Sequence, residues 1–207
     1  YQIGEYYIEE VEIENFLCYG SKNVLNFASL HGLTGLFSPN RWGKSSILSS
    51  VLFCCFNDTL KGVSSISSLI NDQMPENTQA YVQVKLNING VSWRIKRTII
   101  PTSTGGKIKL EVYETVEGKE VARHEESRPQ TDNKVLRKLL GTKEVFLTTV
   151  LCTATNLDEF SKSKNSERLD LIMKFLGISI YDQKLKLCDE DLKKNSYLYE
   201  KLQEELE

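Results

Sequence analysis

The chain has 207 residues, of which 40% are hydrophobic and 26% charged, so its composition is that of a globular protein and excludes a disordered chain. Lys and Arg total 26 against 28 Asp and Glu, giving a net charge of −2 and excluding a binder whose whole surface is basic. No apolar run reaches the ~18 residues of a membrane helix, and five irregularly spaced cysteines indicate reduced thiols, so we expect a cytoplasmic protein without a membrane partner.

Short apolar runs in the first part of the chain predict β-strands followed by a helix. Apolar residues mix with acids over residues 7–16, and two further apolar runs cover residues 24–27 and 33–37. After a polar loop, apolar residues recur at helical spacing from about Gly43 to Cys55. This spacing predicts a helix that buries one face.

Alternation of apolar and polar residues makes residues 80–98 the clearest strand signal. The run is interrupted by Asn89-Gly90, the dipeptide preferred in a type I′ hairpin turn because both residues tolerate positive φ. A further strand is expected over residues 108–113, with a turn near Gly118. These segments predict an antiparallel β meander inserted after the first helix.

Helical patterns dominate the last third of the chain. Helices are expected over residues 133–140 and 167–175, ended by Gly141 and Gly177 respectively. Beyond them, apolar and small residues recur at alternating three- and four-residue steps. The residues of this seam are Leu185, Cys188, Leu192, Asn195, Tyr199, Leu202 and Leu206.

The seam predicts the start of a coiled coil over residues 180–207, after a domain formed by residues 1–179. An amphipathic surface helix is the alternative interpretation.

The motif with specific chemistry is the stretch SPNRWGKSS, residues 38–46, here called the P-loop. It matches the pattern G-x-x-x-x-G-K-[ST], with Ser38 at the first glycine, between a predicted strand and a predicted helix. Loop amides and the helix dipole would bind phosphates, with Lys44 at the β- and γ-phosphates, Ser45 on Mg²⁺ and Ser46 at the α-phosphate. Asn40, Arg41, Trp42 and Gly43 complete the loop expected to hold ATP and Mg²⁺.

Hydrolysis requires an acid of the Walker B type, usually at the end of an apolar strand, and the sequence offers no good candidate. Asp58 follows the predicted P-loop helix and should point away from the phosphates, and Asp72 follows only two apolar residues. We therefore expect half of the ATPase machinery to come from elsewhere.

These segments resemble the N-terminal half of an SMC-like DNA-repair ATPase head of the SbcC type, a family that includes the large subunits of phage-encoded recombination endonucleases. The resemblance implies an α/β fold, the N-terminal lobe of an ABC-type P-loop ATPase head with an antiparallel β meander that leads into a coiled coil. It is carried by the following segments: residues 13–20, Pro39-Asn40, residues 43–46, 69–71 and 93–97, Phe146, residues 149–151, Phe160, Glu167-Arg168 and residues 176–178.

The resemblance further implies a set of partners. These are the C-terminal half of the same head, a homodimer of heads that sandwiches ATP, a metal-dependent nuclease of the SbcD type, and double-stranded DNA in the nucleoid or in a host cytoplasm. Four positions depart from the family pattern. Arg41 and Trp42 replace small residues, Leu17 replaces an arginine common among relatives, and the Q-loop glutamine is missing near Cys152.

DNA contact is expected from four basic residues at alternate positions of neighbouring meander strands, Arg94, Lys96, Lys107 and Lys109, with a solvated sheet face as the alternative.

The predicted function is an ATP-driven head whose dimerisation controls DNA binding and a nuclease in double-strand-break repair or recombination. A chromosome-organising SMC head, or one of RecN or RecF type, stays open within the same class. Outside that class, a nucleotide-binding structural subunit without hydrolysis and a small P-loop kinase also stay open. The seam and the missing Walker B acid argue against the kinase.

Overall fold

The chain divides into two compact units, Gly4–Lys143 and a smaller unit of Tyr1–Ile3 with Glu144–Glu207. Phe160, Gly177 and Leu206, which entered the sequence analysis, lie outside the described residues. The computed structural model describes residues 6–63, 65–75, 77–103, 105–124, 127–153, 158, 161–176 and 178–204.

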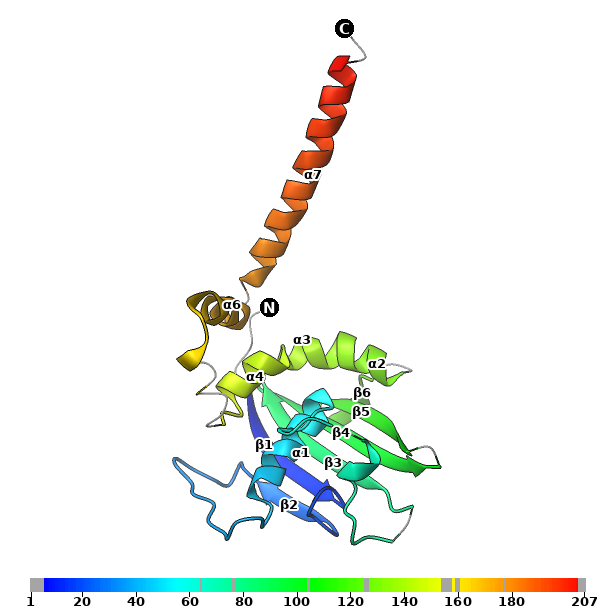
Figure 1. The fold of residues 1–207 in the computed structure, drawn as a ribbon. Helices are drawn as coiled ribbons and strands as arrows, with labels where there is room; N and C mark the ends of the chain where they lie inside the picture. The colour runs from blue at the N-terminus through cyan, green and yellow to red at the C-terminus, as the bar shows by residue number, and fades with distance from the viewer. Residues whose placement is uncertain are drawn as a thin grey trace. The chain divides into compact units, whose positions relative to one another are not determined.

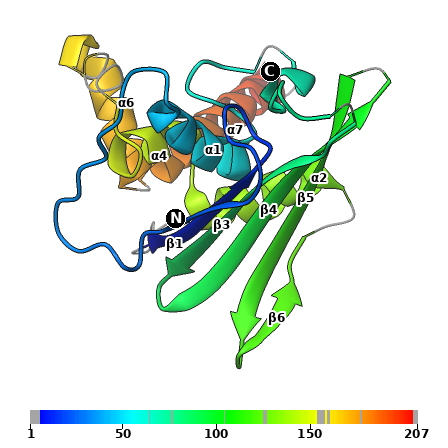
Figure 2. The same ribbon diagram turned by 90° about the horizontal axis from the view of Figure 1, so that it is seen from below.

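The larger unit is built on an antiparallel sheet of order β2-β1-β3-β4-β5-β6 (Figures 1 and 2). The Asn89-Gly90 turn between the third and fourth strands has φ values of 52° and 83°, as a type I′ turn requires. The predicted meander is therefore confirmed, because the last four strands pair in chain order. The strands are β1 (Tyr6–Glu14), β2 (Asn23–Asn26), β3 (Ala80–Ile88), β4 (Val91–Thr102), β5 (Gly105–Val116) and β6 (Lys119–Ala122).

Residues 33–37 form no strand, so this prediction is wrong. Leu33 and Phe37 are 104% and 92% exposed, and no strand pairing in the described ranges involves this segment. An apolar run becomes a strand only when a neighbour takes up its backbone hydrogen bonds. Without such a neighbour, these residues form an exposed loop that immediately precedes the P-loop in the chain.

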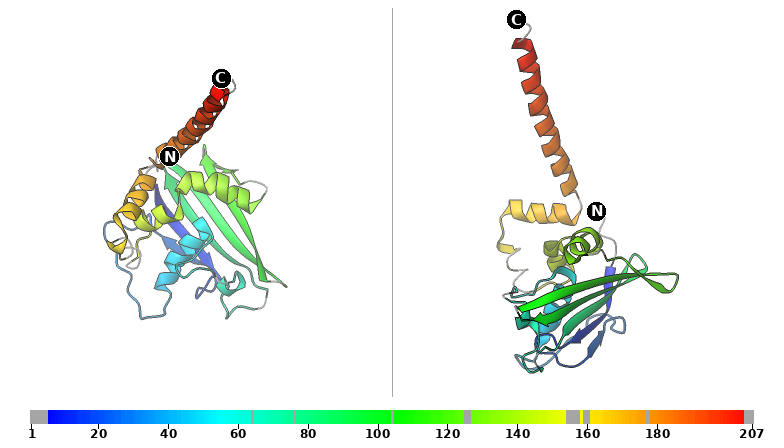
Figure 3. Two further views of the ribbon diagram at one scale, coloured as in Figure 1. Left: turned by 45° about the horizontal axis from the view of Figure 1, so that its top comes forward. Right: turned by 90° about the vertical axis from the view of Figure 1, so that its right-hand side faces the viewer.

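Helices cover one face of the sheet. Helix α1 (Lys44–Phe56) packs on β3 and β4, as Figure 3 shows, and confirms the predicted P-loop helix. A second helical segment runs through α2 (Arg128–Thr131), the π-helical turn η2 (Asp132–Leu136) and α3 (Arg137–Leu140). It includes the predicted helix over residues 133–140 and contacts both α1 and β5.

The core lies between the sheet and α1, where Val84, Ile95 and Val112 pair across neighbouring strands and are fully buried. Burial raises the pKa of the Cys54 thiol on α1 to about 12. The next inward position of β4 is Arg97, which is also 0% exposed.

Arg97 joins three elements. Its Nε donates to the carbonyl of Cys54 at 3.0 Å, and its terminal nitrogens donate to the Asp132 carboxylate at 2.7 and 3.4 Å. The Cys54 carbonyl belongs to the last turn of α1, where carbonyls lack partners within the helix. Arg97 thus caps α1 from the sheet and ties it to η2.

The smaller unit contains most of α4 (Lys143–Thr149), together with α6 (Asn165–Phe175) and α7 (Ser179–Glu204). On α7 the seam residues Leu185, Leu192 and Tyr199 are 62%, 68% and 63% exposed. The seam therefore lies open along a single helix, and the coiled coil stays a prediction. Among the described residues, no helix is long and apolar enough to cross a membrane.

We expect the two partners of the buried ion pair to respond unequally to mutation. Asp132→Ala should lower the free energy of unfolding by about 3–5 kcal/mol, because it leaves the Arg97 guanidinium buried without a counter-charge. Arg97→Met should cost only about 1–2 kcal/mol, because the Asp132 side chain is 26% exposed and can be hydrated. Urea unfolding of both variants measures the difference, and equal losses would contradict this account.

Candidate functional site

The P-loop leads into the N-terminus of α1, where Gly43 is the N-cap residue with a φ of 87°. A Cβ atom at Gly43 would lie 2.6 Å from Cys18 Sγ and 3.3 Å from the Tyr19 hydroxyl. Both the backbone conformation and the lack of space therefore require glycine here. The Ser46 amide donates back to the Gly43 carbonyl at 2.9 Å. The amides of Lys44 and Ser45 precede the first helical hydrogen bonds of α1, and their position at the helix N-terminus suits an anion.

Lys44 closes the loop on itself. Its Nζ donates to the carbonyls of Ser38 and Pro39 at 2.6 and 2.8 Å, and lies 3.3 Å from the Ser38 hydroxyl. An ammonium group has three donors. The two carbonyls leave one donor for a ligand or for the weaker Ser38 hydroxyl contact.

The structure explains why Ser38 can replace the first glycine of the P-loop pattern, and it shows that Arg41, which replaces a small residue of the family, has an unfavourable backbone conformation. Ser38 acts through its main-chain carbonyl and is not among the described residues with positive φ, so a glycine is not needed there. Arg41 has a φ of 68°, a left-handed conformation that is unfavourable for a residue with a side chain.

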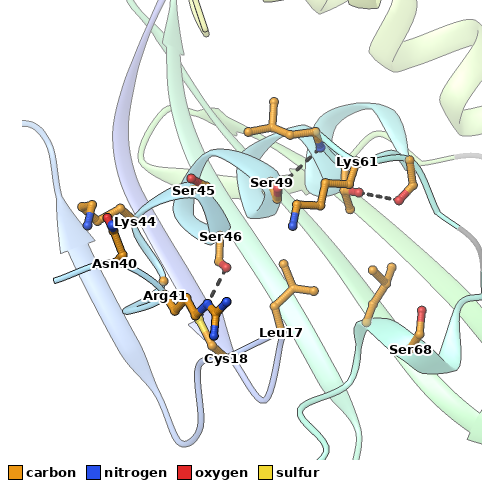
Figure 4. Close-up of a pocket in the computed structure, with 15 residues that line it drawn as sticks. Leu17, Cys18, Asn40, Arg41, Lys44, Ser45, Ser46, Ser49, Lys61 and Ser68 are labelled. Atoms are coloured by element: carbon orange, nitrogen blue, oxygen red, sulfur yellow. Dashed lines mark hydrogen bonds between the residues drawn. The ribbon is translucent and has the colours of Figure 1, made fainter. Parts of the chain in front are cut away.

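A cavity of about 610 Å³ lies beside the P-loop and falls within the size range of small-molecule sites (Figure 4). Three parts of the larger unit form it: the P-loop with the start of α1, the turn after β1, and the loop after α1 with η1 (Ser67–Leu69). The lining residues are Leu17, Cys18, Asn40, Arg41, Gly43, Lys44, Ser45, Ser46, Ser49, Thr59, Leu60, Lys61, Gly62, Ser68 and Leu69.

Six of the eight predicted P-loop residues line this cavity, and Ser38 and Trp42 do not. Trp42 is 72% exposed, so it does not crowd the space where phosphates would bind. Sequence reasoning missed the loop of residues 59–62. One residue in the sequence could have indicated this loop. Asn57 is the C-cap of α1 with a φ of 57°, and it ends the helix so that the chain can turn back.

The cavity suits an anion, since three basic residues line it, namely Arg41, Lys44 and Lys61. The described lining residues include no carboxylate. Asp58 is adjacent in sequence but outside the lining, with one carboxylate oxygen 2.5 Å from Lys143 Nζ and the other accepting the Thr59 amide. This agrees with the expectation that Asp58 does not serve the phosphates.

The four bases proposed for DNA lie on the outer face of β4 and β5, but acidic partners are interleaved with them. The Arg94 guanidinium pairs with Glu120 at 2.6 Å and stacks over Tyr113, and its hydrogen bond lowers the pKa of Glu120. The other placements are Lys109 paired with Glu111 at 3.1 Å, Lys96 over the Tyr81 ring, and Lys107 exposed.

Comparison with known proteins identifies a family to which the chain is similar. A family model described as an AAA domain matches residues 10–207. Two DNA double-strand break repair Rad50 ATPases are similar. The protein from Methanocaldococcus jannaschii is 24% identical over 96% of this chain and 18% of its own length, and that from Thermoplasma volcanium is 25% identical over 97% and 21%.

An uncharacterized protein of Acanthamoeba polyphaga mimivirus is 23% identical over 84% of this chain and 13% of its own length. The chain thus spans about a fifth or less of the curated relatives it matches. A solved structure from work on ATP-driven dimerisation and DNA-stimulated activation of SMC ATPases covers 81% of this chain and 98% of its own, with a TM-score of 0.55 and 23% identity.

The strained backbone at Arg41 yields a test with a built-in control. Arg41→Gly should raise the free energy of unfolding by up to about 1 kcal/mol, because glycine adopts positive φ without steric conflict. Trp42→Ser at the next, exposed position should change it by less than about 0.5 kcal/mol. Chemical denaturation of the two variants compares them, and a destabilised Arg41→Gly variant would show that the arginine side chain supports the loop.

Proposed function

Since the chain belongs to the AAA domain family and has the fold of the N-terminal region of an SMC- or Rad50-like ATPase head, we propose that it binds ATP with Mg²⁺ in the P-loop cavity. The observation that carries the proposal is the arrangement at the start of α1. The N-terminal residues of α1, Lys44 and Ser45, line one cavity, which Arg41 and Lys61 also line. These are the groups that stabilise a polyphosphate.

The residues that line the cavity account for only part of what Mg²⁺ binding and ATP hydrolysis require. Ser45 follows Lys44 in the cavity lining and offers the hydroxyl that holds Mg²⁺ in P-loop proteins. No carboxylate among the described lining residues could act as a second anchor or orient a water molecule. Bound Mg²⁺ would neutralise charge on the phosphates, and the group that activates water must come from another polypeptide segment.

We assign that role to a C-terminal half of the same head. The exposed apolar residues Leu33, Leu36 and Phe37 immediately precede the P-loop, at 104%, 60% and 92% exposure. A docked segment that pairs with residues 33–37 would cover them and bring its acidic residues next to the cavity. The limited span of this chain within its relatives is consistent with a second half.

Two further exposed surfaces, at Trp42 and along the α7 seam, suit larger assemblies. Trp42 is exposed and lies in sequence between two cavity-lining residues, Arg41 and Gly43, so a second head that closes the cavity would cover it. The open seam on α7 would pair with a returning helix to make a coiled coil. Because the archaeal relatives are named double-strand break repair ATPases, we propose a role in DNA repair or recombination, with double-stranded DNA and an SbcD-type nuclease as partners.

A nucleotide-binding subunit without hydrolysis is the second candidate. The lack of a lining carboxylate favours it as long as this chain is considered alone. The two candidates differ in what happens when the C-terminal half is supplied, because only an ATPase head then gains turnover.

Lys44→Ala is expected to weaken ATP binding by at least about tenfold, because one charge-assisted hydrogen bond contributes roughly 1.5–3 kcal/mol. The exposed Lys119→Ala serves as the control for loss of one positive charge. Isothermal titration with Mg·ATP measures both, and circular dichroism should show an intact fold. Unchanged affinity in the Lys44 variant would remove the P-loop assignment.

Residues 1–207 alone should hydrolyse ATP no faster than background. Adding the C-terminal half, fused or in trans, should restore phosphate release and reduce self-association through the α7 seam. Phosphate release and solution mass are the readouts. Rapid turnover by the isolated chain would contradict the split head, whereas no turnover in the presence of both halves would favour the subunit without hydrolysis.

A further inference from the structure

The turn after β1, residues 15–20, is anchored on several sides and is called the brace here. The main-chain N–H of Asn15 donates to the Gly20 carbonyl at 2.7 Å, and the main-chain N–H of Leu17 donates to the Leu69 carbonyl at 2.7 Å. Phe16 is fully buried, with its ring centroid 4.9 Å from that of Phe53 on α1. The brace is therefore fixed to the core, to η1 and to the body of α1.

Two side chains of the brace reach the P-loop. The Tyr19 hydroxyl donates to the Gly43 carbonyl at 3.2 Å, and the Cys18 thiol donates to the Ser46 hydroxyl at 3.4 Å (Figure 4 labels Cys18 and Ser46). The Gly43 carbonyl also accepts the Ser46 amide at 2.9 Å. Cys18 lines the cavity, but Tyr19 does not, so Tyr19 touches the loop without facing the ligand space.

We propose that Tyr19 is a positioning residue for phosphate binding, which it serves by fixing the peptide unit between Gly43 and Lys44. The Gly43 carbonyl and the Lys44 amide belong to one planar trans peptide, so a donor that fixes the oxygen also sets the direction of the N–H group. Two donors on this oxygen hold the Lys44 amide away from them. This inference rests on the proposed nucleotide site.

The chemistry of the hydroxyl agrees with this role. A tyrosine hydroxyl is protonated at neutral pH and can donate, and partial burial raises the pKa of Tyr19 further. Gly43 contributes no side chain that could hold its own peptide, and its positive φ is open to few residues. The Tyr19 hydroxyl adds a second restraint on this peptide to the one that the Ser46 amide provides, and restraint before the ligand arrives lowers the ordering cost of binding.

Tyr19→Phe in the full chain tests the proposal, because it removes only the oxygen and keeps the ring. We expect the affinities for Mg·ATP and Mg·ADP to fall together by about three- to tenfold, the effect of one hydrogen bond. Without nucleotide, hydrogen exchange at the Ser46 amide, which donates to the same Gly43 carbonyl, should become faster, while the unfolding temperature changes by less than about 2 °C. Tyr7→Phe, at a 59% exposed tyrosine of β1, is the matched control and should change neither quantity.

Lys44→Ala, measured in parallel, separates the two levels of the argument. If Lys44→Ala loses affinity and Tyr19→Phe does not, the positioning role is overturned and the proposed function stands. If Tyr19→Phe lowers the unfolding temperature without faster exchange at the Ser46 amide, the tyrosine is merely structural and the proposal is again overturned. If neither variant loses affinity, the nucleotide site itself is wrong and the inference falls with it.

Discussion

The buried guanidinium of Arg97 is the constraint on which the placement of the P-loop helix depends. A charge in the apolar layer of a sheet is tolerated only when hydrogen bonds and a counter-charge satisfy it. Cys54 on α1 and Asp132 on η2 supply these groups, which holds the last turn of α1 against β4. The brace holds the opposite end of the helix through Gly43.

A helix held at both ends explains why the loop that precedes it can carry unfavourable residues. Arg41 adopts a positive φ, and Trp42 projects into solvent, yet Lys44 still spans the loop to the Ser38 carbonyl. The free energy that stabilises this geometry comes from the core beneath α1. Arg41 and Trp42 are therefore free to differ from the family pattern, provided that Gly43, Lys44 and Ser45 are kept.

The sequence predicted those parts of the fold that depend on local patterns. Alternation and the Asn89-Gly90 turn were sufficient to predict the meander, and helical spacing was sufficient for α1. Residues 33–37 were wrongly predicted as a strand, because an apolar run records the need for burial but not whether a partner strand is present. The P-loop was found from its spacing, whereas Lys61 and Tyr19 reach the site only through tertiary folding.

Arg97 could have been recognised from the sequence. In the run Ile95-Lys96-Arg97-Thr98-Ile99, strict alternation places Arg97 on the same face as the two isoleucines. A charge at an inward position signals a buried pair, although the sequence does not say which carboxylate completes it. The outer face illustrates the converse, because Arg94 was visible in sequence but its pairing with Glu120 on β6 depended on how the strands are arranged in the sheet.

The position of a bound triphosphate tests the central claim most directly. A crystal structure of the chain with Mg²⁺ and a non-hydrolysable ATP analogue should place the β- and γ-phosphates within hydrogen-bonding distance of the amides of residues 43–46 and of Lys44 Nζ, with the Ser45 hydroxyl on the metal. A triphosphate bound elsewhere, or an empty P-loop cavity at saturating analogue, would contradict the account.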